Sequence, residues 1–148
     1  MTTRPLWRCP SCDREFANRN QSHACSRHTL DEHFAGREPR VRAIFDAFLA
    51  RIEAIGPVRV LAEKTRIAFQ VRMSFAQLTT RRAYANGHLV LARRVDGSPF
   101  RKVDTISARN HVHHFRLDSV DDVAAIEPWL AEAYAVGRQE HLTSATGP

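Results

Sequence analysis

The sequence predicts an α+β protein in which an N-terminal and a C-terminal helix pack on a mostly antiparallel four-stranded sheet, preceded by a small cysteine-containing segment. Three observations lead to this fold class. One apolar stripe has the period of a helix, several later runs alternate with the period of a strand, and all three cysteines lie within the first 25 residues. A length of 148 residues is enough for one good hydrophobic core. We expect a segment 1–36, an α+β domain 37–141 and a flexible tail 142–148.

Two helices are expected on either side of Gly36. Thr29-Leu30-Asp31-Glu32 has the form of a capping box and predicts a single short helix that Gly36 ends. A longer helix begins at Pro39 and ends at Gly56-Pro57, because Pro is favoured at the first helical position and Gly-Pro cannot continue a helix. Its apolar side chains recur every three or four residues and form the face toward the core. They are Val41, Ile44, Phe45, Phe48, Leu49, Ile52 and Ile55.

Four strands are expected after this helix, because apolar and polar residues alternate in four runs. The runs are residues 58–63, 66–75, 88–94 and 111–117. A turn at Asn86-Gly87 precedes the third run, and a loop or irregular strand through Asp96-Gly97-Ser98-Pro99 precedes the fourth. Alternation in the fourth run sends His113 and His114 to opposite faces, so the histidines there do not predict a second metal site.

The C-terminal segment is expected to form a helix in two pieces. Ser119-Val120-Asp121-Asp122 is typical of a helix start, where carboxylates also favour the helix dipole. Pro128 starts the second piece, and Gly137 ends it. Together with the preceding elements, this arrangement places helices on one face of the sheet.

The opposite face of the sheet is expected to be polar and basic. The chain carries a net charge of +6, and residues 37–117 contain sixteen Lys and Arg against six acidic residues, whereas 118–148 contain one Arg against six. Nearly all the cations are Arg, whose planar fork suits phosphate and carboxylate, although an arginine-rich proteome would give the same bias. If Ile67, Phe69, Val71 and Met73 face the helices, candidate ligand-binding residues lie on the other side. They are Lys64, Arg66, Arg72, His114 and Arg116.

Cys9-Pro10-Ser11-Cys12 and His23-Ala24-Cys25 predict a zinc site. A Cys-x2-Cys turn aims two sulfurs at one ion, and a His/Cys pair at loop distance completes four ligands, which leaves no open position and makes the metal structural. The expected ligands are Cys9, Cys12, His23 and Cys25. The alternative takes His28 in place of Cys25 and gives Cys-x2-Cys-x10-His-x4-His, close to a two-Cys, two-His finger with a short spacer.

Five blocks of this sequence carry a family resemblance. They are Trp7-Arg8-Cys9-Pro10-x-Cys12, Asn20-Gln21-x-His23-x-Cys25, His33-Phe34-Ala35-Gly36, Lys64-Thr65-Arg66-Ile67-Ala68-Phe69 and Val112-His113-His114-Phe115. From about Trp7 to Gly137 the chain resembles domain-of-unknown-function family 5655 with an N-terminal zinc-binding extension. The resemblance implies a small bacterial α+β domain without an established activity. Members carry an aromatic residue where this chain has His28, which supports Cys25 as the fourth ligand.

The sequence favours binding over catalysis. It contains no Gly-rich phosphate loop, no Gly-x-Ser-x-Gly, no His-Glu-x-x-His and no cysteine left over as a nucleophile. We therefore expect a non-enzymatic binding module for nucleic acid or another polyanion. The alternative is a small-molecule-binding or enzymatic domain that acts on an anionic ligand through Lys64, Arg66 and His114, which a concave pocket around these residues would favour.

Two further expectations concern partners and location. An acidic C-terminal helix and a basic middle could pair between two copies of the chain, which would make it a protein-interaction domain. No apolar run approaches the length of a membrane span, and the start lacks the apolar stretch of a secretory signal. We expect a cytoplasmic protein with no membrane partner.

Overall fold

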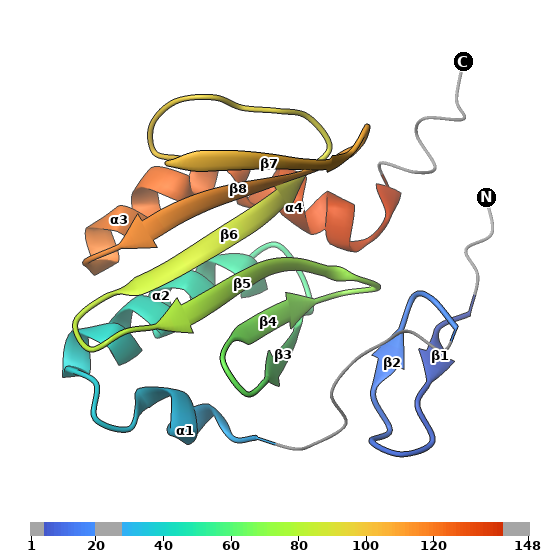
Figure 1. The fold of residues 1–148 in the computed structure, drawn as a ribbon, viewed down its shortest axis with the longest axis horizontal. Coiled ribbons are helices and arrows are strands. Elements are labelled where there is room, and N and C mark those ends of the chain that lie inside the picture. Colours follow the sequence, from blue (N-terminus) through green and yellow to red (C-terminus); the bar gives the residue numbers. More distant parts are fainter. Residues whose placement is uncertain (1–4, 20–27, 141–148) are drawn as a thin grey trace.

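The computed structural model describes residues 5–19 and 28–140. Figure 1 shows an antiparallel sheet with helices behind one of its faces and a small hairpin of the first residues beside it. The large sheet has six strands in the order β3-β4-β5-β6-β8-β7, and every neighbouring pair is antiparallel. The α+β class, the antiparallel sheet and the C-terminal helix are therefore confirmed, whereas the predicted number of four strands is wrong.

The elements have the following bounds in the described residues. The helices are α1 (Leu30–Phe34), α2 (Pro39–Glu53), α3 (Val120–Ile126) and α4 (Leu130–Gly137), with a 3-10 turn η1 (Glu127–Trp129) before α4. The strands of the large sheet are β3 (Arg59–Ala62), β4 (Ile67–Gln70), β5 (Ser74–Thr80), β6 (Ala85–Leu91), β7 (Lys102–Ser107) and β8 (Asn110–Leu117). A separate hairpin pairs β1 (Trp7–Arg8) with β2 (Glu15–Phe16).

The helices α1 and α2 begin where the sequence indicates, but α2 ends at Glu53, before the predicted Gly56-Pro57, so the predicted place of Ile55 on its core-facing stripe is wrong. The Thr29 hydroxyl accepts the Glu32 N–H at 3.4 Å, Gly36 adopts a φ of +71°, and Pro39 occupies the first turn of α2. The stripe of α2 is buried at Val41, Ile44, Phe45, Phe48 and Ile52, whereas Ile55 lies beyond the helix and is 42% exposed. Local capping chemistry and hydrophobic periodicity thus account for both helices.

The predicted strand 66–75 is two strands, because the chain turns back at residues 71–73. The Val71 N–H donates to the Met73 carbonyl at 3.2 Å, and the N–H groups of Arg72 and Met73 donate to the Gly137 carbonyl at 2.9 and 3.0 Å. The end of α4 therefore holds this turn in place. Val71 and Met73 are turn residues, so their predicted place in one long strand is wrong, although Val71 still packs against the core.

Two other strand boundaries differ from the prediction. The strand β6 begins at Ala85, so Asn86-Gly87 is paired with β5 and β8 and is not a turn. The turn lies four residues earlier, at Arg82-Ala83, where the Arg81 N–H donates to the Tyr84 carbonyl at 2.8 Å. In addition, the predicted loop or irregular strand contains β7, an edge strand that pairs with β8 with a register shift between Thr105 and Ser107.

The core lies between the sheet and the helix layer. Phe48 of α2 contacts Phe69 of β4 and Phe115 of β8, with ring centroids 5.0 and 6.1 Å apart. His113 lies on the same face and is fully buried; its Nε2 accepts the Val95 N–H at 2.9 Å, and burial lowers its pKa. The opposite face of the sheet, which we call the open face, carries His114. In the described part of the chain, no helix has both the length and the apolar character to cross a membrane.

Candidate functional site

Residues of the β3–β4 turn, β5 and α1 line a pocket of about 630 Å³. These three segments lie together at one end of the sheet (Figure 1). We call it the cationic pocket, because its lining includes Arg37, Lys64, Arg66 and Arg81. The remaining lining is polar and consists of three threonines, Gln77, His33 and the carboxylate of Glu32. Four cations against one acid make the pocket strongly positive.

The β3–β4 turn supplies two of the four cations. The Glu63 N–H donates to the Arg66 carbonyl at 2.9 Å, which closes a two-residue loop with Lys64 and Thr65 at its exposed tip. The next residue, Ile67, is buried in the core. Alternation along the strand therefore directs Arg66 to the open face, where its Nη1 donates to Gln77 Oε1 at 3.4 Å.

The other two cations come from segments that are distant in the sequence. Arg37 lies in the α1–α2 connection, and its guanidinium donates to the hydroxyl and the carbonyl of Thr80, both at 3.4 Å. The Thr80 hydroxyl in turn donates to the His33 carbonyl, which ties α1 to the end of β5. Arg81 follows directly after β5. Arg37 and Arg81 could not be predicted as site residues from the sequence, because no local pattern places them beside the β3–β4 turn.

Most Arg and Lys side chains of the described residues outside the pocket pair with a carboxylate, whereas most of those in the pocket do not. Within the described residues, Arg37, Lys64 and Arg81 form no ion pair, and Arg66 lies 3.5 Å from Glu63. Cations without a carboxylate partner remain available to an anionic ligand, because binding need not first break an ion pair.

The other predicted ligand-binding residues are not in the pocket. His114 Nε2 lies 2.9 Å from Asp104 Oδ2, and this hydrogen bond lowers the pKa of Asp104. Arg116 pairs with Asp118 at 2.8 Å and stacks over the ring of Tyr84 at 3.6 Å. The Arg72 Nε donates to Gln139 Oε1 at 3.0 Å, at the opposite end of β4 from the β3–β4 turn. The structure therefore brings Lys64 and Arg66 together and leaves His114, Arg116 and Arg72 elsewhere.

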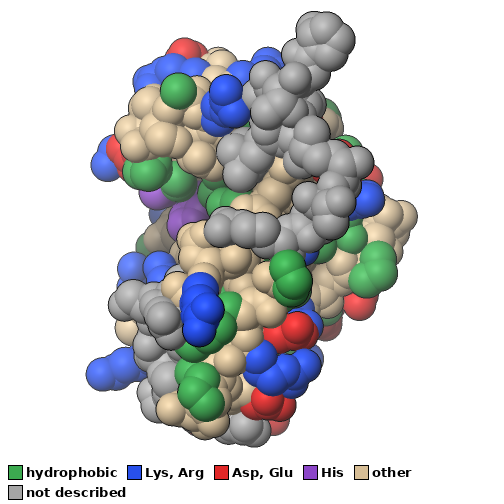
Figure 2. All heavy atoms as spheres, turned by 90° about the vertical axis from the view of Figure 1, so that its right-hand side faces the viewer, with side chains coloured by type: hydrophobic (Ala, Val, Ile, Leu, Met, Phe, Trp, Pro, Cys, Tyr) green, Lys and Arg blue, Asp and Glu red, His purple; other side chains and the backbone are tan. Residues whose placement is uncertain are grey.

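A histidine lies on the open face between the cationic pocket and His114. His88 of β6 is paired across the sheet with Gln77 of β5 and His114 of β8, and the two imidazole rings are 5.6 Å apart. Burial, assisted by His114 and Arg66, lowers the pKa of His88 to about 4, so the ring is neutral at pH 7. Figure 2 shows histidine side chains recessed in a hollow, with Lys or Arg side chains on both sides.

Cys9 and Cys12 lie in the tight turn of the N-terminal hairpin. They are 4% and 5% exposed and pack with Phe16 and Trp7. The Asp13 N–H donates to the Cys9 carbonyl, and the Cys9 N–H donates to the Arg14 carbonyl, both at 2.8 Å. Backbone hydrogen bonds therefore fix the turn that carries both sulfurs. His23 and Cys25, the other expected zinc ligands, lie outside the described residues.

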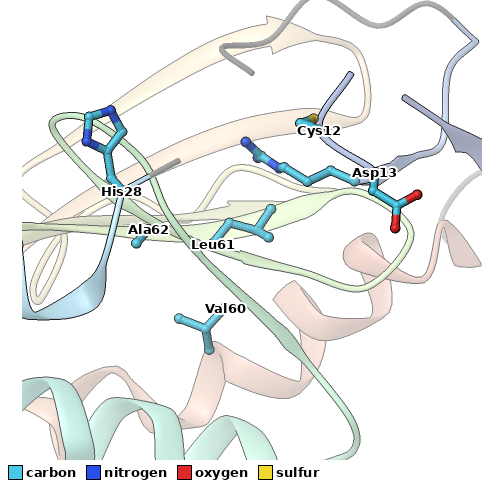
Figure 3. Close-up of a pocket in the computed structure, with 7 residues that line it drawn as sticks. Cys12, Asp13, His28, Val60, Leu61 and Ala62 are labelled. Carbon is cyan, nitrogen blue, oxygen red and sulfur yellow. The ribbon is translucent and has the colours of Figure 1, made fainter. Parts of the chain in front are cut away.

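His28, the alternative ligand, is engaged elsewhere. Its Nδ1 lies 3.0 Å from Glu32 Oε2 in the first turn of α1. His28 and Cys12 line the same pocket of about 370 Å³, but they lie on opposite sides of it (Figure 3). Across residues 5–19 and 28–140, no three His, Cys, Asp or Glu side chains are grouped so that they could hold a metal ion.

Residues 30–137 match the model of a protein family described as Domain of unknown function (DUF5655). The matched range begins with α1 and ends with α4, so it contains the cationic pocket and leaves out the cysteine turn. No curated protein and no solved structure matches the chain.

Proposed function

The chain belongs to the DUF5655 family, and we propose that it binds a small ligand bearing one or more phosphate groups in the cationic pocket. The observation that carries this proposal is the convergence of Arg37, Lys64, Arg66 and Arg81, three of which form no ion pair in the described residues. Guanidinium groups donate two parallel hydrogen bonds to phosphate oxygens, and Lys adds a mobile point charge. A volume of about 630 Å³ is in the range of small-molecule sites.

The shape and charge of the surface favour a small ligand over a nucleic acid. The cations lie around a concave pocket, whereas Arg116 on the same face is paired with Asp118, and Lys102 lies 3.5 Å from Asp104. A nucleic acid backbone laid across this face would meet carboxylates as well as cations. None of the described residues that line the pocket is Phe, Tyr or Trp, so the pocket offers no ring on which a base could stack.

The pocket supports binding without catalysis. His33 is the one histidine among its described lining residues, and it is only 7% exposed. Its Nε2 lies 2.6 Å from the Glu63 carbonyl, which engages this nitrogen in a structural hydrogen bond. Because this ring is nearly buried and its Nε2 is engaged, the described lining residues offer no exposed imidazole to a ligand.

Calorimetric titration with pyrophosphate tests the proposal. Lys64→Gln and Arg81→Gln should each weaken binding about tenfold or more, since a charge-assisted hydrogen bond contributes roughly 1.5–3 kcal/mol. Arg116→Gln is the matched control, because it removes an Arg from the open face outside the pocket, and its dissociation constant should equal that of the wild type.

Two results would contradict the proposal. One is an unchanged dissociation constant in both pocket variants. The other is an absence of pyrophosphate binding together with tight binding of single-stranded DNA or RNA whose affinity falls steeply with salt, which would identify a nucleic-acid module instead.

We also propose that Cys9 and Cys12 hold a structural zinc ion together with His23 and Cys25. The support is that both cysteines are buried on one hydrogen-bonded turn of a hairpin whose apolar core is very small. So small a segment needs a staple in order to fold, and zinc supplies one when it is bound by four ligands. The hydrogen bond of His28 with Glu32 favours Cys25 over His28 as the fourth ligand.

Metal analysis of the purified protein tests the zinc site. The wild type should contain one zinc ion per chain, and Cys9→Ser, Cys12→Ser and Cys25→Ser should each lose it, because a structural site uses all four ligands. The control is His28→Ala, which should retain the metal. A Cys9→Ser, Cys12→Ser double variant that still carried one zinc per chain would exclude this site.

A further inference from the structure

Glu63 joins the cysteine turn to the cationic pocket. Its carboxylate contacts two guanidinium groups, one on each oxygen: Arg66 Nε lies 3.5 Å from Oε1, and Arg14 Nη2 lies 3.8 Å from Oε2. Arg66 lines the pocket, whereas Arg14 directly follows the cysteine turn. One negative charge is therefore shared between the two parts of the protein.

The backbone around Glu63 keeps this carboxylate in place. The Glu63 N–H donates to the Arg66 carbonyl at 2.9 Å, and the Glu63 carbonyl lies 2.6 Å from His33 Nε2. The Glu63 side chain is only 17% exposed and that of Arg14 only 20%. The Arg66 side chain is 51% exposed, so salt screens its pair with Glu63 more than it screens the more buried pair of Arg14 with Glu63.

The N-terminal hairpin is anchored to the sheet close to this carboxylate. Arg59 of β3 donates to the Glu15 carboxylate at 2.9 Å, and the buried Gln70 of β4 donates to the Glu15 carbonyl, also at 2.9 Å. Glu15 follows Arg14 in the chain, so this anchoring sets where the guanidinium of Arg14 lies. A shift of the hairpin would move Arg14 relative to Glu63.

We infer that Arg14 is a positioning residue that raises the affinity of the cationic pocket by drawing the charge of Glu63 away from Arg66. This inference rests on the proposed phosphate-binding function. A phosphate ligand competes with Glu63 for the guanidinium of Arg66, and Arg14 weakens that competitor. When the hairpin leaves the sheet, Glu63 pairs with Arg66 alone and the affinity falls, so the docking of the cysteine segment regulates the pocket.

A double-mutant cycle with pyrophosphate as the probe tests this inference. Glu63→Gln should tighten binding and Arg14→Gln should weaken it, each by about threefold to tenfold, the range expected for one partly buried ion pair. Arg14→Gln should change the affinity much less in the Glu63→Gln background, because the competing carboxylate is already gone. Arg14→Lys should restore most of the wild-type affinity, and Arg93→Gln, whose partner is Glu132, should have no effect.

A second measurement needs no ligand. In an NMR spectrum, the side-chain Nε–H resonance of Arg66 should shift between the wild type and Arg14→Gln. It should not shift between Glu63→Gln and the double variant that carries both changes. The inference is overturned if Arg14→Gln weakens binding equally in both backgrounds, which would show a simple loss of positive charge, or if the Arg66 resonance does not respond. If the wild type binds pyrophosphate and the cycle shows no coupling between Arg14 and Glu63, the inference alone is refuted. If the wild type does not bind pyrophosphate, the proposed function is refuted as well.

Discussion

His88 shows how the burial of single residues sets the charge of the open face. Its neighbours are His114 across the sheet and Arg66 of the cationic pocket, both of which disfavour a second positive charge. Desolvation is the largest cause of its lowered pKa, so the ring is uncharged under physiological conditions. The open face is therefore less positive than a count of its basic residues suggests, and its charge is concentrated in the pocket.

The lowered pKa of His88 predicts that the protein loses stability on acidification. The unfolded chain takes up the proton near pH 6.5 and the folded chain only near pH 4, so the free energy of unfolding falls as the pH is lowered between these values. The contribution of His88 is on the order of 3 kcal/mol, and His88→Gln should remove this part of the pH dependence. Urea denaturation near neutral pH and near pH 4 measures it, with His111→Gln as a control that keeps the wild-type response. Equal losses in wild type and His88→Gln would contradict the prediction.

At the scale of elements, α3 shows how a short helix is started by its own sequence. The Asp122 carboxylate accepts the N–H groups of Asp118 at 2.7 Å and Ser119 at 3.2 Å. These bonds satisfy donors just before the helix, where the chain leaves β8. The exposed neighbour Asp121 carries the same charge in the same turn.

These two aspartates form a matched pair for a stability measurement. Asp122→Ala should lower the free energy of unfolding by about 1 kcal/mol, because two backbone donors lose their acceptor. Asp121→Ala should cost much less, since it removes only the favourable charge near the helix dipole. Thermal or urea unfolding of both variants gives the difference, and equal effects would show that charge, and not the capping hydrogen bonds, stabilises the start of α3.

Elements defined by local chemistry are predictable from this sequence, and elements defined by distant contacts are not. The helix α2 follows from Pro39 and its apolar stripe, and α1 follows from its capping box. The break between β4 and β5 is held by the Gly137 carbonyl, which no pattern around residues 71–73 indicates. The sequence predicts the segment of β7 only as a loop or irregular strand. An edge strand hydrogen-bonds on one side only, and β7 carries Ile106 69% exposed, so it lacks the apolar alternation of a buried strand.

At the scale of the whole molecule, the cationic pocket also depends on contacts between distant segments, which the sequence does not predict. Lys64 and Arg66 could be singled out because they share one turn. Arg37 and Arg81 join them only because β5 pairs with β4 and the α1–α2 connection contacts Thr80 (Figure 1). Half of the candidate site is therefore a product of the tertiary fold. His114 and Arg116 show the converse: the sequence predicts both on the open face of the sheet, but each lies outside the pocket and contacts a carboxylate there.

The two-residue turn between β3 and β4 also has a consequence for how this protein can evolve. A single inserted residue there would alter the loop geometry that presents Lys64 and Arg66, while the paired strands on either side could keep their register. Related chains could in this way lose or exchange their ligand through a change of loop length and still fold. Among homologues, the length of this turn should therefore separate chains that share a ligand from chains that share only an architecture.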